Sequence, residues 1–472
     1  MKRSILAFAC MAFTLNGMAQ DADAQLTTSY QHSAFALFNA LLQQEPQKDN
    51  ICFSPLSVQM ALSMVQNGAA GNTLSQLQQA LGTTGFTNEE ISQFNNKLSK
   101  ALTERPTEEM QYIEQEAEWA GVDPQEMFDG YFPKCELANG LWTRPDVQLY
   151  DTFVDVLRSY YDAGVDAVWF DTWEGIEKIN AWATDKTHGL IPKIYQEPQS
   201  SDLAVVLANA LYFKGSWTVP FDPENTEKGQ FWLDDESYAN VDMMLARDRF
   251  DCAMTPSFQT ITLYYGANFD FSMTLFVPLE GTTLPPLTFE DWTAAMKPTN
   301  MHINLYMPRF EIDGNYDLVG VLYSLGVTDA FNNKADFTQM CKVNRAIDKI
   351  YQLSKIIVNE EGTEAAALTV IEMPDGMDMT RPEDYQDFKV DRPFYFTIQS
   401  REANAILFAG RVTHLEGTIE HVTGIERPTP DPSRDGGEKA GAWYDLSGRK
   451  GALSRTLPKG IFIRDGKKVV VK

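Results

Sequence analysis

The sequence predicts an α+β fold, because helix-like and strand-like segments both occur but do not alternate regularly. Apolar residues recur with a helical period in 27–44 and again in 58–81. Apolar, aromatic and β-branched residues dominate four segments that are typical of strands: 203–213, 258–277, 301–312 and 390–411. The absence of regular βαβ alternation argues against a doubly wound parallel sheet.

The first 19 residues (1–19) are expected to be a secretory signal peptide. Lys2 and Arg3 precede a short apolar run, and small residues at 17–19 offer a cleavage site before Gln20. Cys10 leaves a lipoprotein alternative open, although the apolar stretch before it is short. We therefore expect a secreted protein that is extracellular or at the cell surface after cleavage, with the periplasm as an alternative.

The helices that follow have recognisable ends. The helix at 27–44 is expected to end near Pro46, and glycines at 68–71 divide the helical segment 58–81. Residues 104–134 form an acidic stretch that looks like an insertion. We interpret this stretch as a solvated excursion, with an acidic docking surface for a basic partner as the alternative.

Composition excludes several classes of function. The formal net charge of −26 disfavours nucleic acid and anionic membranes as partners, since both are polyanions. The sequence has no HExxH spacing, GxSxG turn or CxxC pair. We therefore expect that the protein is not an enzyme and that it binds neither a metal ion nor a cofactor. Four cysteines remain after signal removal, and we expect idle buried thiols, with disulfide pairing left open.

The C-terminal part has a different character. Residues 421–440 are expected to be a linker, because they are rich in proline, glycine and charged residues. Residues 441–472 read as short strands joined by turns and resemble part of the sorting modules of exported Bacteroidetes proteins. A sorting or attachment role and a plain β appendage remain alternatives.

The most informative stretch is 358–373. If it formed a strand, alternate residues would share a face, and one such face carries no charge: Thr363, Ala365, Ala367, Thr369, Ile371 and Met373. The following segment, 374–382, has the prolines and glycine of an exposed loop. A segment able to be loop in one state and strand in another suggests a stored conformational change.

This stretch resembles the hinge and reactive loop of the serpins, and further motifs follow in the order of that family. They are 50–57 (NICFSPLS), 68–73 (GAAGNT), 179–182 (INAW), 186–191 (KTHGLI), 207–217 (LANALYFKGSW), 220–221 (PF), 307–310 (MPRF), 325–326 (LG), 335–337 (ADF), 391–394 (DRPF) and 407–411 (LFAGR). The resemblance covers roughly 27–416 and, with the C-terminal segment, points to a bacterial, Bacteroidetes-like secreted serpin. It implies a single serpin domain at 20–420, with three β-sheets, about eight or nine helices and an exposed reactive loop at about 360–390.

The resemblance also implies a mechanism. A serpin is a suicide substrate, in which the target protease attacks the reactive loop and is trapped as an acyl-enzyme when the loop inserts into the central sheet. The expected partners are chymotrypsin-, elastase- or subtilisin-like serine proteases, with cysteine proteases as an alternative. No heparin dependence is expected, because the comparable region is acidic, and a monomer is expected. A non-inhibitory serpin, acting as a binding module or a plain substrate, is the alternative function.

Site residues follow from the same resemblance. The implied hinge comprises Glu360, Glu361, Gly362, Thr363, Glu364, Ala365, Ala366 and Ala367. Counting from the hinge places the reactive bond at Gly376–Met377, with Met379 and Arg381 as alternatives. The implied sheet-opening region comprises Ser54, Ser57, Asn209, Trp217 and Gln352. The family often has a histidine near the position of Gln352, and glutamine cannot titrate near neutral pH.

Overall fold

The computed structural model describes residues 2–105, 107–233, 237–363, 385–421, 443–444, 460–464 and 467–471. Its helices are α1 (Lys2–Gln44), α2 (Pro55–Gln66), α3 (Gly71–Leu81), α4 (Asn88–Thr103), α5 (Thr107–Ala120), α6 (Pro124–Tyr131), α7 (Asp151–Tyr161), α8 (Trp173–Lys186), α9 (Phe289–Ala295) and α10 (Val319–Ser324). The predicted end of the first helix is confirmed, and this helix begins at Lys2. None of the helices in the described ranges has the length and apolarity needed to span a membrane.

Local sequence signals explain where several helices begin. The Ser54 hydroxyl accepts a hydrogen bond from the backbone N–H of Ser57 at 3.3 Å, and Pro55 occupies the first position of α2. At the start of α4, Thr87 and Glu90 form a reciprocal capping box. Every residue of α2 is buried, so this helix lies inside the molecule rather than on its surface.

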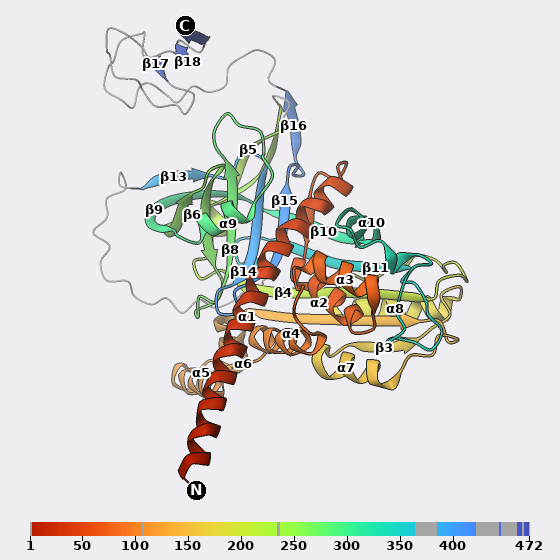
Figure 1. Cartoon of the computed structure of the whole chain (residues 1–472). Helices are drawn as coiled ribbons and strands as arrows, with labels where there is room; N and C mark the ends of the chain where they lie inside the picture. The colour runs from red at the N-terminus through yellow and green to blue at the C-terminus, as the bar shows by residue number, and fades with distance from the viewer. Residues whose placement is uncertain are drawn as a thin grey trace.

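The central sheet has six strands in the order β10-β11-β12-β4-β2-β3. Their bounds are β10 (Phe310–Asp317), β11 (Lys349–Val358), β12 (Gly362–Thr363), β4 (Val205–Ser216), β2 (Lys134–Thr143) and β3 (Gly164–Ala167). Successive side chains of β4 point to opposite faces. One face packs on α2, and on the other Ala183 of α8 meets Ala210 and Leu353. Figure 1 shows α8 and the pair α2–α3 at this sheet.

A second sheet of ten strands follows the path β1-β15-β14-β8-β7-β6-β9-β13, with β5 and β16 also paired to β6. The bounds are β1 (Ile51–Phe53), β5 (Glu227–Trp232), β6 (Ser237–Met254), β7 (Phe258–Tyr264), β8 (Phe271–Pro278), β9 (Thr299–Pro308), β13 (Gln386–Lys389), β14 (Phe394–Ser400), β15 (Ala405–Val412) and β16 (Thr418–His421). All four segments predicted as strands contain strands. The 18-residue strand β6 pairs with β5, β7, β9 and β16 and so joins the parts of this sheet. The predicted α+β fold class is confirmed.

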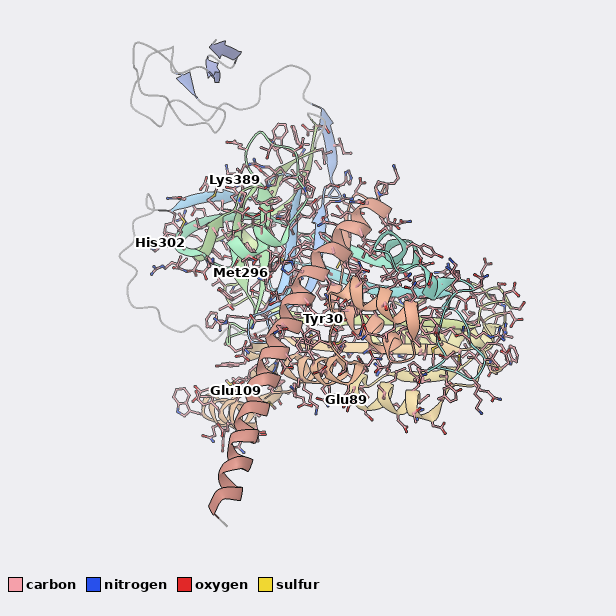
Figure 2. All side chains as sticks on the ribbon, in the orientation of Figure 1. Tyr30, Glu89, Glu109, Met296, His302 and Lys389 are labelled. Carbon is pink, nitrogen blue, oxygen red and sulfur yellow. The ribbon has the colours of Figure 1, made fainter. Side chains whose placement is uncertain are left out.

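The core is dominated by aromatic and aliphatic side chains between these layers. Tyr30 illustrates how the helices are joined, because its hydroxyl lies 2.8 Å from Ser63 Oγ of α2 and donates to Asn95 Oδ1 of α4 at 3.1 Å. Figure 2 shows Tyr30 where α1 crosses these helices. Burial raises the pKa of the Tyr30 phenol, so it remains neutral and able to donate.

The C-terminal strands β17 (Trp443–Tyr444), β18 (Gly460–Arg464) and β19 (Lys467–Val471) form a three-stranded antiparallel sheet. Strands were predicted here, whereas a sorting role stays a prediction. Most of the predicted linker, from 422 onward, lies outside the described residues.

Candidate functional site

The candidate site is a place in the central sheet where two strands are paired at one end and separated by a third strand at the other. Strand β11 pairs in parallel with β4 from Lys349–Val206 to Leu353–Ala210. At the opposite end, β12 lies between them and is antiparallel to both. The expected hinge therefore begins as a short strand already seated in the central sheet.

Gly362 and Thr363 fit this position for different reasons. A Cβ atom at Gly362 would lie 2.1 Å from the carbonyl oxygen of Gly215, so the close approach of the two backbones requires glycine. Thr363 is fully buried, and its Oγ1 lies 2.5 Å from the hydroxyl of Tyr265. The Tyr265 ring is stacked on Trp217 with 4.4 Å between ring centroids.

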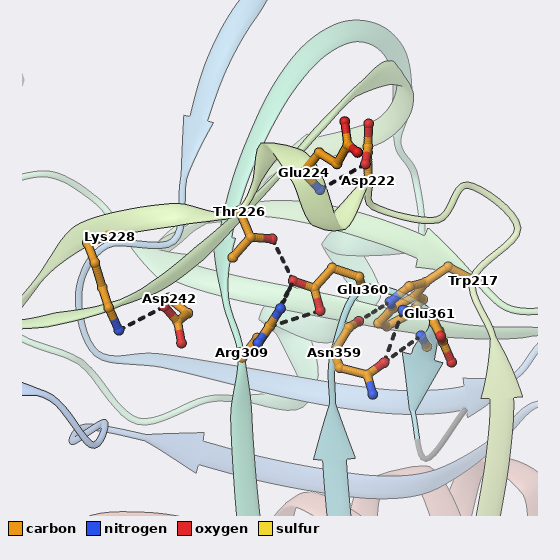
Figure 3. A network of polar contacts seen from close by, with 11 residues as sticks. Trp217, Asp222, Glu224, Thr226, Lys228, Asp242, Arg309, Asn359, Glu360 and Glu361 are labelled. Atoms are coloured by element: carbon orange, nitrogen blue, oxygen red, sulfur yellow. Dashed lines mark hydrogen bonds and ion pairs between the residues drawn. The ribbon is translucent and has the colours of Figure 1, made fainter. Parts of the chain in front are cut away.

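Trp217 holds the chain that leads into β12. Its backbone N–H donates to the Glu361 carbonyl at 2.8 Å, and its indole Nε1–H donates to the Asn359 carbonyl at 2.9 Å. The side chain of Asn359 accepts hydrogen bonds from the backbone N–H groups of Glu361 and Gly362, at 3.0 and 3.2 Å. Figure 3 shows these contacts. The turn between β11 and β12 is thus fixed by both backbone and side chains.

Glu360 is buried in this turn and is paired with a cation. Its carboxylate accepts hydrogen bonds from the Arg309 guanidinium, with Nε at 2.8 and 2.9 Å from the two oxygens, and from the Thr226 hydroxyl (Figure 3). Burial by itself would raise the pKa of the Glu360 carboxyl, but the hydrogen bonds from Arg309 and Thr226 outweigh it and hold this pKa below its ordinary value. Glu360 is therefore charged at neutral pH.

A second group of expected residues lies deeper in the sheet. Gln352 is paired in register with Asn209, and both are buried. Asn209 donates to the side-chain oxygen of Asn139, which in turn donates to the Tyr161 carbonyl at 3.0 Å. Among the described residues, neither amide atom of Gln352 has a hydrogen-bond partner, and the same holds for Ser57 Oγ. This part of the sheet is held by backbone pairing and retains unused polar groups.

The structure therefore divides the five residues of the expected sheet-opening region. Ser54 caps the start of α2 by accepting from the Ser57 backbone N–H, and α2 packs on β4. Asn209 and Gln352 form a pair across the two strands. Trp217 lies at the other end, beside the hinge. The hinge residues Glu364, Ala365, Ala366 and Ala367, and the reactive-bond residues Gly376, Met377, Met379 and Arg381, lie outside the described residues.

The sequence predicts a hinge at these residues but does not indicate their contacts with Arg309, Thr226 and Tyr265. Arg309 lies in the motif at 307–310, so the motif gave a signal without showing what the guanidinium binds. Thr226 and Tyr265 gave no local signal, because each meets the hinge only through the packing of segments that are distant in the sequence.

The cysteines offer no reactive thiol at this site. Cys52, Cys135, Cys252 and Cys341 are free and buried, and burial raises the pKa of the Cys52 and Cys135 thiols to about 12. Within the described ranges, no three or more metal-binding side chains are grouped as a metal site would require.

Comparisons with known proteins show the family of the chain. The family model described as Serpin (serine protease inhibitor) matches residues 28–415. Serpin B8 of Bos taurus is 33% identical over 388 residues, which cover 79% of this chain and 94% of that protein. Neuroserpin of Homo sapiens is 30% identical over 407 residues, covering 79% and 88%. These relatives are vertebrate proteins, so they do not support the expected bacterial, Bacteroidetes-like origin.

Solved structures share the fold. Tengpin, a thermophilic serpin in its native state, matches with a TM-score of 0.70 and 23% identity, covering 82% of this chain and 94% of that chain. Serpin48 of Tenebrio molitor matches with a TM-score of 0.68 and 25% identity, covering 84% and 99%. Family members are in general protease inhibitors rather than enzymes. With the family match over most of its length and the fold that it shares with solved serpins, the chain belongs to the serpin family.

Proposed function

We propose that this protein is a secreted inhibitor of serine proteases that traps its target as an acyl-enzyme by inserting its reactive loop into the central sheet. The observation that carries the proposal is the burial of Thr363 between β11 and β4. The first inserted residue already occupies its place, so continued insertion needs an extension of β12 rather than a new strand.

The register of β12 specifies where the next hinge residues would go. Thr363 is opposite Gly215 and Val358, so two residues further along the hinge Ala365 would meet Phe213 and Ile356. Both of these side chains are buried. An alanine adds a side chain there without a clash or an unpaired polar group, which is the requirement for entry into a closing sheet.

The same register gives a role to the unused polar groups of the sheet. Thr369 would lie between Asn209 and Gln352, after the sheet has parted at this pair. Its hydroxyl can both donate and accept hydrogen bonds, and Gln352 has an amide N–H and a carbonyl oxygen to offer. Insertion would thereby satisfy buried groups that lack partners among the residues that the structure describes.

The opposite face of the inserted segment would carry its two charges. In the register of β12, Glu364 would be opposite Lys214, and Glu372 would be opposite Lys349. Lys214 and Lys349 are both partly exposed, so each new pair would form at the surface, where opposite charges facing one another are modestly favourable. The two glutamates therefore do not oppose insertion.

The available strand length also fits. Strand β4 begins at Val205, whose partner in this register would be Met373, and Pro374 follows directly. Proline cannot donate a ladder hydrogen bond, so it suits a position at the end of the inserted strand.

The chemistry would come from the protease. Its serine attacks the carbonyl of the reactive bond, an ester forms, and the new amine end of the loop leaves. Insertion then competes with hydrolysis of the ester by water. If insertion displaces the attached protease first, the enzyme is trapped, whereas slow insertion leaves a cleaved inhibitor and a free protease.

We place the reactive bond at Gly376–Met377, with bonds at Met379 and Arg381 as alternatives. Methionine suits chymotrypsin-, elastase- or subtilisin-like pockets, and cysteine proteases are a further class to test. Protease nexin-1, another serpin of known structure, was solved with heparin, so heparin binding occurs in the family. For this chain the acidic character of α5 and α6 argues against it.

The test is incubation of the mature protein with chymotrypsin, elastase, subtilisin, trypsin and a cysteine protease, followed by denaturing gels and mass spectrometry. A denaturant-resistant complex together with a released C-terminal fragment is expected, and the fragment mass locates the reactive bond. The variant Thr363→Arg should be cleaved without forming a complex, because a buried unpaired charge blocks insertion. Glu361→Arg, at a partly exposed neighbouring position, is the matched control. Cleavage of the wild-type protein without a complex by every protease in the panel would indicate a non-inhibitory serpin.

A further inference from the structure

Helix α5 presents aromatic side chains to solvent on a face that no described element covers. Trp119 is 87% exposed and Tyr112 is 54% exposed, and they are seven residues apart, so they lie on the same side of the helix. The opposite side is anchored by Ile113 and Ala117, which are buried. The helix is therefore packed against the protein on one side, and the two rings are exposed on the other.

Carboxylates flank both rings. Glu108 is four residues before Tyr112, while Glu116 is four residues after Tyr112 and three before Trp119, so these carboxylates are neighbours of the rings on the helix surface. Glu118 adds a further negative charge to the same helix. Between residues 107 and 133 the sequence has eight acidic residues and no lysine, arginine or histidine. None of the α5 glutamates forms an ion pair with a residue that the structure describes.

The cations that border this segment are engaged elsewhere. The Arg105 guanidinium lies 5.3 Å from the Phe132 ring and 5.5 Å from the Phe271 ring, and it donates to the Pro133 carbonyl at 3.0 Å. Lys134 is paired with Glu136 at 2.8 Å. The negative charge of α5 is thus left uncompensated beside two exposed rings. That combination suits lysine and arginine side chains, which bind carboxylates and aromatic faces together.

The position of α5 and α6 adds a reason for the choice of partner. The Tyr131 carbonyl at the end of α6 accepts a hydrogen bond from Ala267 N–H at 3.0 Å. Pro133 packs on Gly215, which is the residue paired with Thr363. The acidic helices therefore lie at the end of the central sheet where the hinge enters. Figure 1 shows α5 projecting beside α6, and Figure 2 shows Glu109 on this projection.

We propose that α5 is a docking surface for the target protease, and that it binds a lysine- and arginine-rich patch on the protease while the reactive loop occupies the active site. Charge complementarity and the position next to the hinge carry this inference, which rests on the proposed inhibitory function. Docking would speed association and favour cationic proteases over neutral ones, because opposite charges steer encounter.

The test uses full-length protein and chymotrypsin, a cationic protease, with its catalytic serine replaced by alanine, so that binding is measured without acylation. Surface plasmon resonance compares the wild type with the triple variant Glu108→Gln, Glu116→Gln, Glu118→Gln and with Trp119→Ala. A control triple variant, Glu280→Gln, Glu290→Gln, Glu416→Gln, removes the same charge from exposed positions outside α5 and α6. Circular dichroism establishes that all variants are folded.

The α5 triple variant should associate about tenfold more slowly at low salt, and its salt dependence should be weaker, because fewer charges steer the encounter. Trp119→Ala should raise the dissociation rate, whereas the control variant should behave as the wild type. Equal binding by the α5 and control variants, or no binding by the wild type, would overturn the docking proposal. Active chymotrypsin tests trapping separately. If the α5 triple variant associates at the wild-type rate and forms the covalent complex normally, docking alone is refuted. If the wild-type protein is cleaved without any complex, the inhibitory function is refuted.

Discussion

At the scale of single residues, Glu360 joins the hinge to the rest of the molecule through its charge. The carboxylate is buried, while its partner Arg309 is 44% exposed on its side chain. Replacement of Glu360 by glutamine would weaken several hydrogen bonds at once and would leave the Arg309 guanidinium beside an uncharged amide. The chain that leads into β12 depends on this pair, together with the contacts of Trp217.

Glu360→Gln should lower the free energy of unfolding at neutral pH by about 2 kcal/mol, since hydrogen bonds to charged groups are among the stronger ones. The pKa of Glu360 is depressed below its ordinary value of 4.5, so the stabilisation is present above that pH and is lost as the pH falls through the lower pKa of the folded state. Urea unfolding between neutral pH and pH values below the ordinary pKa checks this. The difference between wild type and variant should be constant above it and shrink below it.

Glu311→Gln provides the control for this measurement. Glu311 pairs with Lys355 but is 54% exposed on its side chain, so its loss should cost about 0.5 kcal/mol or less. A cost equal to that of Glu360→Gln would mean that burial in the hinge turn adds nothing.

Gln352 has the opposite character, because its buried amide lacks partners among the described residues. Gln352→Leu should raise the free energy of unfolding of the uncleaved protein by about 1–2 kcal/mol, since an unsatisfied amide is replaced by an apolar group. In the loop-cleaved protein the same change should be destabilising, because Thr369 would lose its partner. Urea unfolding of both forms checks the reversal of sign.

Gln399 offers a matched comparison. It is also buried, but its amide nitrogen donates to Ser272 Oγ at 3.2 Å and to Thr274 Oγ1 at 2.8 Å. Gln399→Leu should therefore destabilise both forms. If Gln352→Leu behaves in the same way, Gln352 has partners in the uncleaved state and the interpretation of the sheet-opening region is wrong.

At this scale the sequence could indicate the hinge residues but not what holds them. Glycine before a threonine and a run of alanines is a local pattern, and it named Gly362 and Thr363. Arg309 is 51 residues from Glu360 along the chain, and Tyr265 is 98 residues from Thr363. No local pattern encodes contacts of that separation.

At the scale of elements, β12 is too short to show a period by itself, yet its register separates two faces of the hinge. Ala365→Glu would place a carboxylate between Phe213 and Ile356, where burial of an unpaired charge costs several kcal/mol. Ala366→Glu would place it on the other face, opposite Lys355. In Ala365→Glu the ratio of trapped complex to cleaved inhibitor should fall at least about tenfold. In Ala366→Glu this ratio should equal that of the wild type.

Densitometry of complex and cleaved bands on denaturing gels, at equal protease, measures this partition. Equal loss in both variants would show that the register seen at Thr363 does not continue into the inserted strand.

The acidic stretch shows what a charge pattern indicates about an element and what it leaves out. The sequence predicts a solvated excursion over 104–134, and the structure leaves most of the acidic side chains there exposed. The stretch also forms two helices, and α5 buries Ile113 and Ala117. Two apolar positions four residues apart are enough to hold one side of a helix against the protein, and a dense run of glutamates obscures that signal.

At the scale of the whole molecule, the proposal requires that the uncleaved fold be less stable than the cleaved one. An inserted strand running from Thr363 to Met373 would form backbone hydrogen bonds with both β11 and β4. Cleavage of the loop should therefore raise the melting temperature by about 10 °C or more.

Calorimetry of the protein before and after limited cleavage in the loop checks this expectation. Thr363→Arg, cleaved in the same way, should show no rise, because its loop cannot enter the sheet. An unchanged melting temperature in the wild type would mean that the uncleaved fold stores no such free energy.

The sequence by itself determined the α+β class, the helices at 27–44 and 58–81, the strands in four segments, and the small uncharged face of the expected hinge. These depend on side-chain period and turn residues within short windows. Tertiary structure alone decided that β12 is already seated beside β11 and β4, that Arg309 neutralises Glu360, and that Asn209 meets Gln352. The physical reason is that these contacts join segments far apart in the chain. They are fixed by packing and backbone pairing across the whole fold, which short windows of sequence do not encode.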